Sequence, residues 1–460
     1  MKTDAPIAKS EERAVLIGLC LAMLLSALDQ TIVAPALPTI GVELGDYANA
    51  PWIVTSYLVA ATIVTPLYGK LADIHGARAM LLVAIAIFIL GSFACALAPG
   101  MIALCLARVL QAAGGGGILS LAQIAIADLV SPLKRGRYQT WFASVFVTSS
   151  VAGPALGGFF AEHLHWSLIF WINLPLGLLA LAIVRRTLLR LPVRRHPHRI
   201  DYPGAVLLAA ASGLLALGLS QQRAGAVETL ALIAASGLFW WLFVWRQKRA
   251  AEPFFPLSVL QNAIARDAAL SGAFGFGAFI AAGAVTPIYF QGGLSLSIED
   301  SGLALIPMMI GTVVGATISG RLMPHLKRYK APAVVGLAIG FAAALSAALR
   351  LRELNLLQLN TLLTVTSVGV GAMLPVSTVS VQNAVDTKTL GAATAILQFS
   401  RQIGGALIAA LLGALVMGEG AGSRDQVVAS FQLVFGTFAA FLGLSLLFLV
   451  RMEEKPLRGE

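Results

Sequence analysis

Long apolar runs separated by short polar stretches dominate the chain, and this pattern predicts an all-α membrane protein. A helix that crosses a bilayer needs about 20 mostly apolar residues. Fourteen runs of roughly that length are present, and no soluble domain fits between them because the longest polar connection is only about residues 185–202. The predicted spans are 14–37, 50–69, 79–98, 101–127, 138–160, 165–184, 203–219, 229–245, 268–290, 302–323, 331–349, 355–378, 391–416 and 428–450.

The positive charges between the runs predict the orientation of these spans. If the N-terminus is cytoplasmic, 26 of the 32 Lys and Arg residues fall in inside segments, and four, Arg223, Arg350, Arg352 and Arg424, fall outside. Cytoplasmic loops of membrane proteins are enriched in Lys and Arg. The bias therefore predicts that both termini are cytoplasmic. Because a miscount by one would put basic loops on alternating sides, it also favours an even number of spans.

Composition and charge narrow the class of protein further. Only 12% of the residues are charged and 58% are hydrophobic. In soluble domains about 25% of the residues are charged and about 45–50% are apolar. Hydrophilic multidomain enzymes, disordered proteins and fibrous proteins are thereby excluded. The net charge of +10 is explained by the basic inside loops, so we expect a lipid bilayer as partner and no nucleic acid.

The chain offers little that would support enzyme or metal chemistry. Cys20, Cys95 and Cys105 all lie in apolar stretches, with neither a disulfide framework nor metal-ligand spacing. His-Glu-x-x-His, Gly-x-Ser-x-Gly and the nucleotide loop Gly-x-x-x-x-Gly-Lys-Ser/Thr are absent. We therefore expect no enzyme activity, no cofactor, no metal and no nucleotide-driven pump.

Two loops suggest that the chain is built from related halves. Residues 69–78 and residues 320–328 both begin Gly-basic-Leu and continue with turn residues and positive charge. Parallel halves are a transporter architecture, although inside loops in general are often rich in Gly and Arg. The predicted organisation is a cytoplasmic N-terminus 1–13, a six-helix bundle 14–184, a basic loop with two inserted helices 185–267, a second six-helix bundle 268–450 and a cytoplasmic C-terminus 451–460.

The first span is interpreted as a membrane helix and not as a cleavable signal peptide. It is too long for the apolar region of a signal peptide, and it carries Asp29 followed by Pro35 and Pro38.

Three charged residues lie well inside predicted spans, away from their ends: Asp29, Arg108 and Arg401. A charge near mid-membrane costs at least about 2.5–3.5 kcal/mol, so each is a candidate functional residue. At 1.5 Å of rise per residue, Asp29 and Arg108 lie about 12 Å and about 10 Å from the outer ends of their spans. Burial raises the pKa of a carboxylic acid and a neighbouring guanidinium lowers it. This balance predicts Asp29 as a proton site tuned by Arg108; a static ion pair that fixes helix packing is the alternative.

Several motifs, in order along the chain, resemble those of the major facilitator superfamily, in its fourteen-span drug:proton antiporter family. They are residues 28–38 in span 1, 69–78 in the loop between spans 2 and 3, 108–117 in span 4, 153–158 in span 5, 173–177 after Trp166 in span 6, and 401–405 in span 13. The chain departs from the family at Ile74 and Ala77, where basic residues are usual, and at Ser149. Span 13 has no carboxylate, which weakens any scheme with two coupling acids.

The resemblance implies proton-coupled antiport by alternating access between the halves. It assigns gating or conformational roles to Gly69, Asp73, Gly76, Arg78, Gly153, Pro154, Gly157 and Gly158. Asp73 and Arg78 are expected to form a cytoplasmic charge cluster with Lys134, Arg135 and Arg137, or else a solvated face. Small residues allow close helix contacts, and Pro154 is expected to kink its span.

Arg401 is placed among the gating residues, and three roles stay open for it: contact with an anionic substrate group, snorkelling, or bonding to helix-end carbonyls.

The predicted function is proton-coupled efflux of amphipathic or lipophilic compounds from a cell, in a bacterial inner membrane and by a monomer. Export of a specific lipid, siderophore or metabolite, and a facilitative or uptake permease, are the alternatives. A largely apolar pocket with a few polar groups suits such substrates. Candidate cavity residues are Trp52, Tyr57, Gln111, Gln123, Asn173, Gln382, Asn383 and Gln398, with Tyr289 and Gln291 as further candidates.

Overall fold

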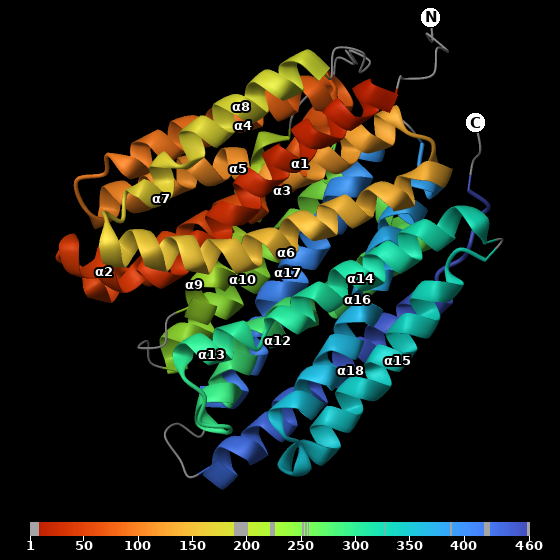
Figure 1. The fold of residues 1–460 in the computed structure, drawn as a ribbon. Helices are drawn as coiled ribbons and strands as arrows, with labels where there is room; N and C mark the ends of the chain where they lie inside the picture. The colour runs from red at the N-terminus through yellow and green to blue at the C-terminus, as the bar shows by residue number, and fades with distance from the viewer. Residues whose placement is uncertain are drawn as a thin grey trace, which may run out of the picture. The chain divides into compact units, whose positions relative to one another are not determined.

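The computed structural model describes residues 9–187, 201–220, 226–250, 253, 255, 257–326, 328–386, 389–417 and 424–457. The regular secondary structure of this part of the chain is helical throughout, as Figure 1 shows, so the predicted all-α class is confirmed. Thirteen helical segments there are long and apolar enough to cross a membrane. The predicted span 203–219 falls in α9 (Tyr202–Ser220), which is not among these thirteen. The count of fourteen and the orientation stay predictions.

The chain forms two compact units, and the first comprises residues 1–129, 148–256 and 388–395. Its helices are α1 (Lys9–Ile32), α2 (Leu37–Glu43), α3 (Pro51–His75), α4 (Ala77–Ala96), α5 (Met101–Leu129), the later part of α6 (Pro132–His163), α7 (Leu168–Trp171), α8 (Asn173–Thr187), α9, α10 (Ala226–Arg249) and the first turns of α17 (Leu390–Met417).

Prolines explain why two predicted spans are broken in this unit. Proline has no N–H to donate and its ring clashes with the preceding turn. The first span is α1, a short 3-10 turn that contains Pro35, and α2. The sixth span is α7 and α8, with Pro175 as the third residue of α8. By contrast, α6 runs as one helix through Pro154.

Small residues bring α3, α4 and α5 into close contact in the first unit. A Cβ added at Gly114 would meet the backbone of Phe88 on α4, and one at Gly116 would meet the backbone of Ala61 on α3. Gly91 on α4 similarly faces the backbone of Gln111 on α5. Figure 1 shows α4 between α5 and α8. Because the backbones approach so closely, short polar side chains from neighbouring helices can reach one another.

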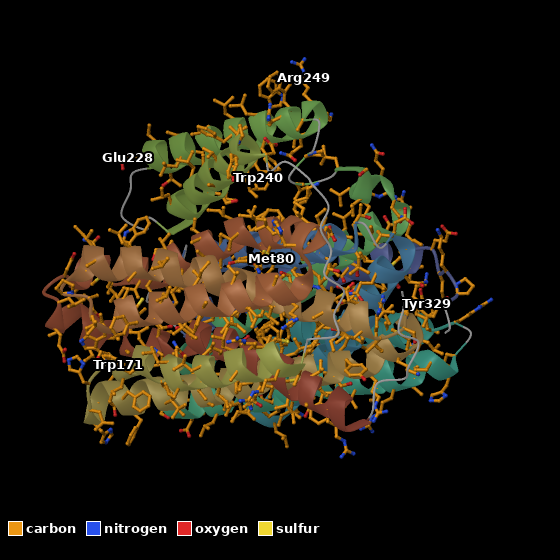
Figure 2. All side chains as sticks on the ribbon, turned by 90° about the horizontal axis from the view of Figure 1, so that it is seen from above. Met80, Trp171, Glu228, Trp240, Arg249 and Tyr329 are labelled. Atoms are coloured by element: carbon orange, nitrogen blue, oxygen red, sulfur yellow. The ribbon has the colours of Figure 1, made fainter. Side chains whose placement is uncertain are left out.

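The pair α9 and α10 packs against α3 mainly through α9. Asp201 ties the two helices together, since its carboxylate accepts hydrogen bonds from Arg246 Nε at 3.1 Å and from Gln247 Nε2 at 3.0 Å. Figure 2 shows Glu228 and Arg249 at opposite ends of α10, with Trp240 between them. Large apolar side chains of α10, among them Trp241, are exposed, as expected for a helix whose other neighbour is lipid.

The second unit comprises residues 130–147, 257–387 and 396–460. Within it α15 packs against both α16 and α18, and α14 packs against α16 (Figure 1). Its helices are the first part of α6, α11 (Leu257–Gln261), α12 (Ala263–Gly292), α13 (Ile298–Leu303), α14 (Ile306–Leu322), α15 (Ala331–Arg350), α16 (Leu356–Ala384), the later part of α17 and α18 (Arg424–Arg451).

The segment after α18, residues 452–457, is bound to the ends of other helices of the second unit. Glu454 accepts a hydrogen bond from the backbone N–H of Lys330 at 2.8 Å, and Lys330 Nζ donates to the carbonyl of Val450 at 2.9 Å. Asn383, at the end of α16, donates to the carbonyl of Pro456 at 3.0 Å. Nearby, burial raises the pKa of Tyr329, so its hydroxyl stays protonated at neutral pH.

Candidate functional site

The first unit contains a buried polar network centred on the carboxylate of Asp29, on α1. Asp29 is 0% exposed. Its Oδ2 accepts a hydrogen bond from Arg108 Nη1 at 2.6 Å, and its Oδ1 accepts from Gln111 Nε2 at 2.8 Å and from Asn173 Nδ2 at 3.1 Å. Arg108 and Asp29 thus form a fully buried ion pair. The two charged residues that the sequence places at similar depth are thus in direct contact.

Arg108 has several partners besides Asp29. The same Nη1 donates to Gln111 Oε1 at 2.6 Å, and Nε donates to the carbonyl of Ile53 at 3.2 Å. The guanidinium lies over the ring of Tyr57, 4.2 Å from its centroid, and 5.7 Å from that of Phe170. Charge-assisted hydrogen bonds and cation–π contacts both stabilise a buried guanidinium. The cation is therefore held by neutral groups as well as by the carboxylate.

Local geometry explains why Arg108 and Gln111 act together. Residues three apart share one face of a helix, so both side chains of α5 point toward α1. Gln111 also donates to Ser92 Oγ on α4 at 2.7 Å. Gly91, next to Ser92, lets the two backbones approach closely enough for that contact.

The break between α7 and α8 positions Asn173. Asn173 is the first residue of α8 and is 1% exposed. Its Nδ2 binds Asp29, whereas its Oδ1 is buried without a hydrogen-bond partner. This oxygen is an unused acceptor beside the carboxylate. A protonated carboxyl group needs such an acceptor for its O–H.

Three residues predicted to line a cavity belong to this network instead of standing apart from it: Tyr57, Gln111 and Asn173. Among the described residues, two other candidates of the first unit form no hydrogen bond with Asp29: Trp52 is half-buried near the start of α3, and Gln123 on α5 is buried with Oε1 unpartnered. Sequence reasoning missed Ser92, the carbonyl of Ile53 and Phe170. Serine and phenylalanine are common in apolar helices, and a backbone carbonyl has no signature in a sequence.

Asp73, a predicted gating residue, contacts the first turn of α17 within the first unit. Its carboxylate accepts hydrogen bonds from the backbone N–H groups of Gly391 at 2.7 Å and Ala392 at 2.8 Å. Carboxylates stabilise helix N-termini in this way. Gly69 lies one turn earlier, where an added Cβ would be 2.7 Å from the carbonyl oxygen of Gly391.

The next two predicted gating residues shape the connection between α3 and α4. Gly76 has φ +86°, a left-handed conformation that favours glycine. Arg78 donates from Nη2 to the carbonyl of Arg185 at 3.2 Å, near the end of α8. Arg78 thus binds a helix-end carbonyl, where a cation interacts favourably with the helix dipole.

The span 5 motif packs against the end of α1. A Cβ at Gly153 would meet Thr31, and one at Gly157 would meet the carbonyl oxygen of Ile32, whereas one at Gly158 would meet nothing within 4 Å. Thr31 Oγ1 also donates to the carbonyl of Ser149 at 2.8 Å. The motif therefore holds α6 close to the helix that carries Asp29, and Pro154 itself is exposed.

The second unit contains the remaining predicted residues, on α12, α16 and α17. Arg401, on α17, donates from Nη2 to Ser377 Oγ, Thr378 Oγ1 and the carbonyl of Leu374 on α16. Asn383 binds the segment after α18, and Gln398 Nε2 is buried without a partner. Gln382 is buried, Tyr289 packs against Phe431 and Phe435, and Gln291 donates to Ser301. Within the described ranges, no group of three or more His, Cys, Asp or Glu residues is placed to hold a metal ion.

A bundle of membrane-length helices around a buried acid–base pair defines a polytopic membrane transporter, and comparison with known proteins specifies the family. A family profile described as Major Facilitator Superfamily matches residues 19–409. The chain therefore belongs to the major facilitator superfamily.

Two relatives that are named as transporters are similar to this chain over most of its length. An uncharacterized MFS-type transporter of Mycobacterium tuberculosis is 35% identical over 407 residues, which are 86% of this chain and 58% of that protein. The chain thus spans less than two thirds of this relative's length. The multidrug transporter protein MdtP of Bacillus subtilis is 32% identical over 422 residues, 89% of this chain and 76% of MdtP.

A solved structure shows the same fold. The proton:xylose symporter XylE superposes with a TM-score of 0.66 at 15% identity, covering 97% of this chain and 98% of that one. At this identity the likeness concerns the fold alone.

Proposed function

We propose that the protein exports amphipathic or lipophilic compounds in exchange for protons, with Asp29 as the proton site. The observation that carries this proposal is the surroundings of the Asp29 carboxylate. It is buried among three donors, and beside it lies the unpartnered Oδ1 of Asn173. The carboxylate of a permanently charged ion pair needs only hydrogen-bond donors around it. A carboxyl group that gains and loses a proton needs an acceptor as well.

The contacts of Arg108 support the same proposal. When Asp29 takes up a proton, Arg108 loses an ionic partner but keeps Gln111 Oε1, the carbonyl of Ile53 and the ring of Tyr57. An isolated buried cation would be expensive. Because neutral groups already stabilise this one, the network accommodates both charge states of Asp29. Proton binding then changes the contact between Asp29 and Arg108, and the other hydrogen bonds of the network can remain.

Efflux as the direction is inferred from named relatives. MdtP is called a multidrug transporter, and a second Bacillus subtilis relative, 33% identical over 310 residues, is called multidrug resistance protein 3. An amphipathic compound partitions into the bilayer, so an exporter can bind it there. We expect the protein itself to lie in a bacterial cell membrane.

Reconstituted vesicles test the proposal. Full-length protein is inserted into liposomes, a pH gradient is imposed, and three pyrene probes of similar size are followed: pyrenebutyrate, pyrenebutanol and pyrenebutyltrimethylammonium. Gradient-dependent movement of at least one probe above protein-free liposomes is expected, and Asp29→Asn is expected to abolish it. If no probe moves, or if Asp29→Asn transports like the wild type, the proposal fails. A drug-susceptibility panel on cells with and without the protein, with the same variant, extends the test to other compounds.

A further inference from the structure

Arg401 is a buried cation that, unlike Arg108, has no anionic partner in the part of the chain that the structure describes. Its residue exposure is 5%. Its three hydrogen bonds go from Nη2 to Ser377 Oγ at 2.7 Å, Thr378 Oγ1 at 3.2 Å and the carbonyl of Leu374 at 3.3 Å. All three acceptors are neutral. Ion pairs elsewhere in the second unit join Arg266 and Arg451 to Asp267, and Arg350 to Glu353.

The guanidinium also keeps unused hydrogen-bonding capacity. Nε of Arg401 is buried and has no hydrogen-bond partner. An ideal Cβ built at Gly272 on α12 would lie 3.2 Å from both Cγ and Nε of Arg401. Glycine at this position therefore keeps the space beside Nε free of a side chain. A buried donor that stays unpaired costs free energy, so its retention needs an explanation.

Packing alone explains only part of this arrangement. Arg401 does bind the stretch of α16 that follows Pro375, where the hydroxyl of Thr378 also donates to the carbonyl of Leu374 at 2.9 Å. All three acceptors are neutral, so these contacts do not by themselves require a charge in the membrane. Charged residues within membrane spans are costly and usually mark a substrate or ion pathway.

We propose that Arg401 binds the anionic head group, a carboxylate, of an exported amphiphile. The guanidinium fork matches a carboxylate in geometry and in charge, and Nε supplies a free donor for one of its oxygens. The ligand would provide the counter-charge that the described part of the second unit does not. This inference rests on the proposed export function and specifies one class of its substrates.

Equilibrium binding at one pH tests the inference without transport. Full-length protein in lipid nanodiscs is dialysed against pyrenebutyrate or pyrenebutanol, and binding to empty nanodiscs is subtracted. Wild-type protein is expected to bind the carboxylate at least about tenfold more tightly than the alcohol, since a hydrogen bond to a charged group contributes more than one between neutral groups. Arg401→Gln is expected to abolish that preference. Arg350→Gln, which removes an exposed arginine of the same unit, is expected to leave it unchanged.

Equal affinity of the wild type for both probes, or a preference that survives Arg401→Gln, would overturn the inference and leave Arg401 as a packing residue.

Gly272→Ala provides a second test if Arg401→Gln does not fold. Its new methyl group displaces the guanidinium and should lower pyrenebutyrate affinity several-fold at constant pyrenebutanol affinity; an unchanged preference again overturns the inference. Failure of the pH-gradient assay for all three pyrene probes would instead contradict the proposed export function, whatever the binding preference.

Discussion

Asp29 and Arg401 are both buried charged residues, but different kinds of contact stabilise them. Asp29 accepts hydrogen bonds from three residues and pairs with Arg108, whereas Arg401 contacts only neutral acceptors. Removing one partner of a buried ion pair leaves the other charge uncompensated, and this usually costs more than removing both. The stability of the first unit therefore depends on the presence of both Asp29 and Arg108.

Arg108→Ala is expected to destabilise the protein strongly, by about 3–5 kcal/mol, because it leaves the Asp29 carboxylate buried without a cation. The double variant Arg108→Ala with Asp29→Asn should be more stable than Arg108→Ala alone. Thermal unfolding in detergent measures both. Arg350→Ala is the control, because the exposed Arg350–Glu353 pair should contribute less than about 1 kcal/mol. A double variant no more stable than the single one would contradict this account.

Much of the network could be predicted from the sequence, since polar residues stand out against apolar spans. Asp29, Arg108, Gln111 and Asn173 were all candidates for that reason. Their grouping around one carboxylate could not be predicted, because it depends on which faces of three helices meet. The role of Gly91, which allows Gln111 to reach Ser92, depends in the same way on the packing of α4 against α5.

At the scale of the helix, the sequence predicted where apolar segments run better than where they break. Pro35 and Pro175 interrupt their segments, but Pro154 lies within a continuous α6. A proline costs a helix about 3 kcal/mol or more, and whether a break results depends on how well neighbouring helices hold the backbone. That depends on contacts between segments far apart in the sequence, which no local pattern encodes.

Two adjacent glycines of α6 give a matched test of helix packing. Gly157→Ala should destabilise the protein by about 1–3 kcal/mol, because the new methyl group overpacks against the carbonyl of Ile32. Gly158→Ala meets nothing within 4 Å and should be neutral or stabilising by up to about 1 kcal/mol through helix propensity. Thermal unfolding of both variants, with transport assayed in vesicles, makes the comparison. Equal melting temperatures would show that the approach of α6 to α1 is not tight.

The first turn of α17 gives a second test at this scale. Asp73→Ala removes the acceptor for the N–H groups of Gly391 and Ala392 and should cost about 0.5–2 kcal/mol, as other lost helix caps do. Asp73→Asn keeps one acceptor oxygen and should cost less. Hydrogen exchange at Gly391 and Ala392 reports the effect directly. Unchanged exchange in Asp73→Ala would argue against the capping contact.

For the whole molecule, the distribution of basic residues makes a prediction that can settle the number of spans. Thirteen helical segments of the described chain meet the length and composition of a span, and α9 is not among them, whereas the charge bias favours fourteen spans. The predicted topology places Arg195 inside and Arg223 outside. These two positions flank α9, so they lie on opposite sides only if α9 crosses the bilayer.

Cysteine labelling decides this question. In a background with Cys20, Cys95 and Cys105 replaced by alanine, Arg223→Cys in intact cells should react with a membrane-impermeant maleimide. Arg195→Cys should react only after the membrane is opened. Equal protection of both positions in intact cells would mean that α9 does not cross and that the two termini lie on opposite sides of the membrane.

The binding of residues 452–457 to distant helix ends has a consequence for biosynthesis. Lys330 and Glu454 are 124 residues apart, and Asn383 and Pro456 are 73 apart. A ribosome that adds about 5–20 residues per second needs several seconds to make either interval. During that time the first turn of α15 and the last turn of α16 lack these partners. The second unit therefore cannot complete these contacts until residues 452–457 have been synthesised.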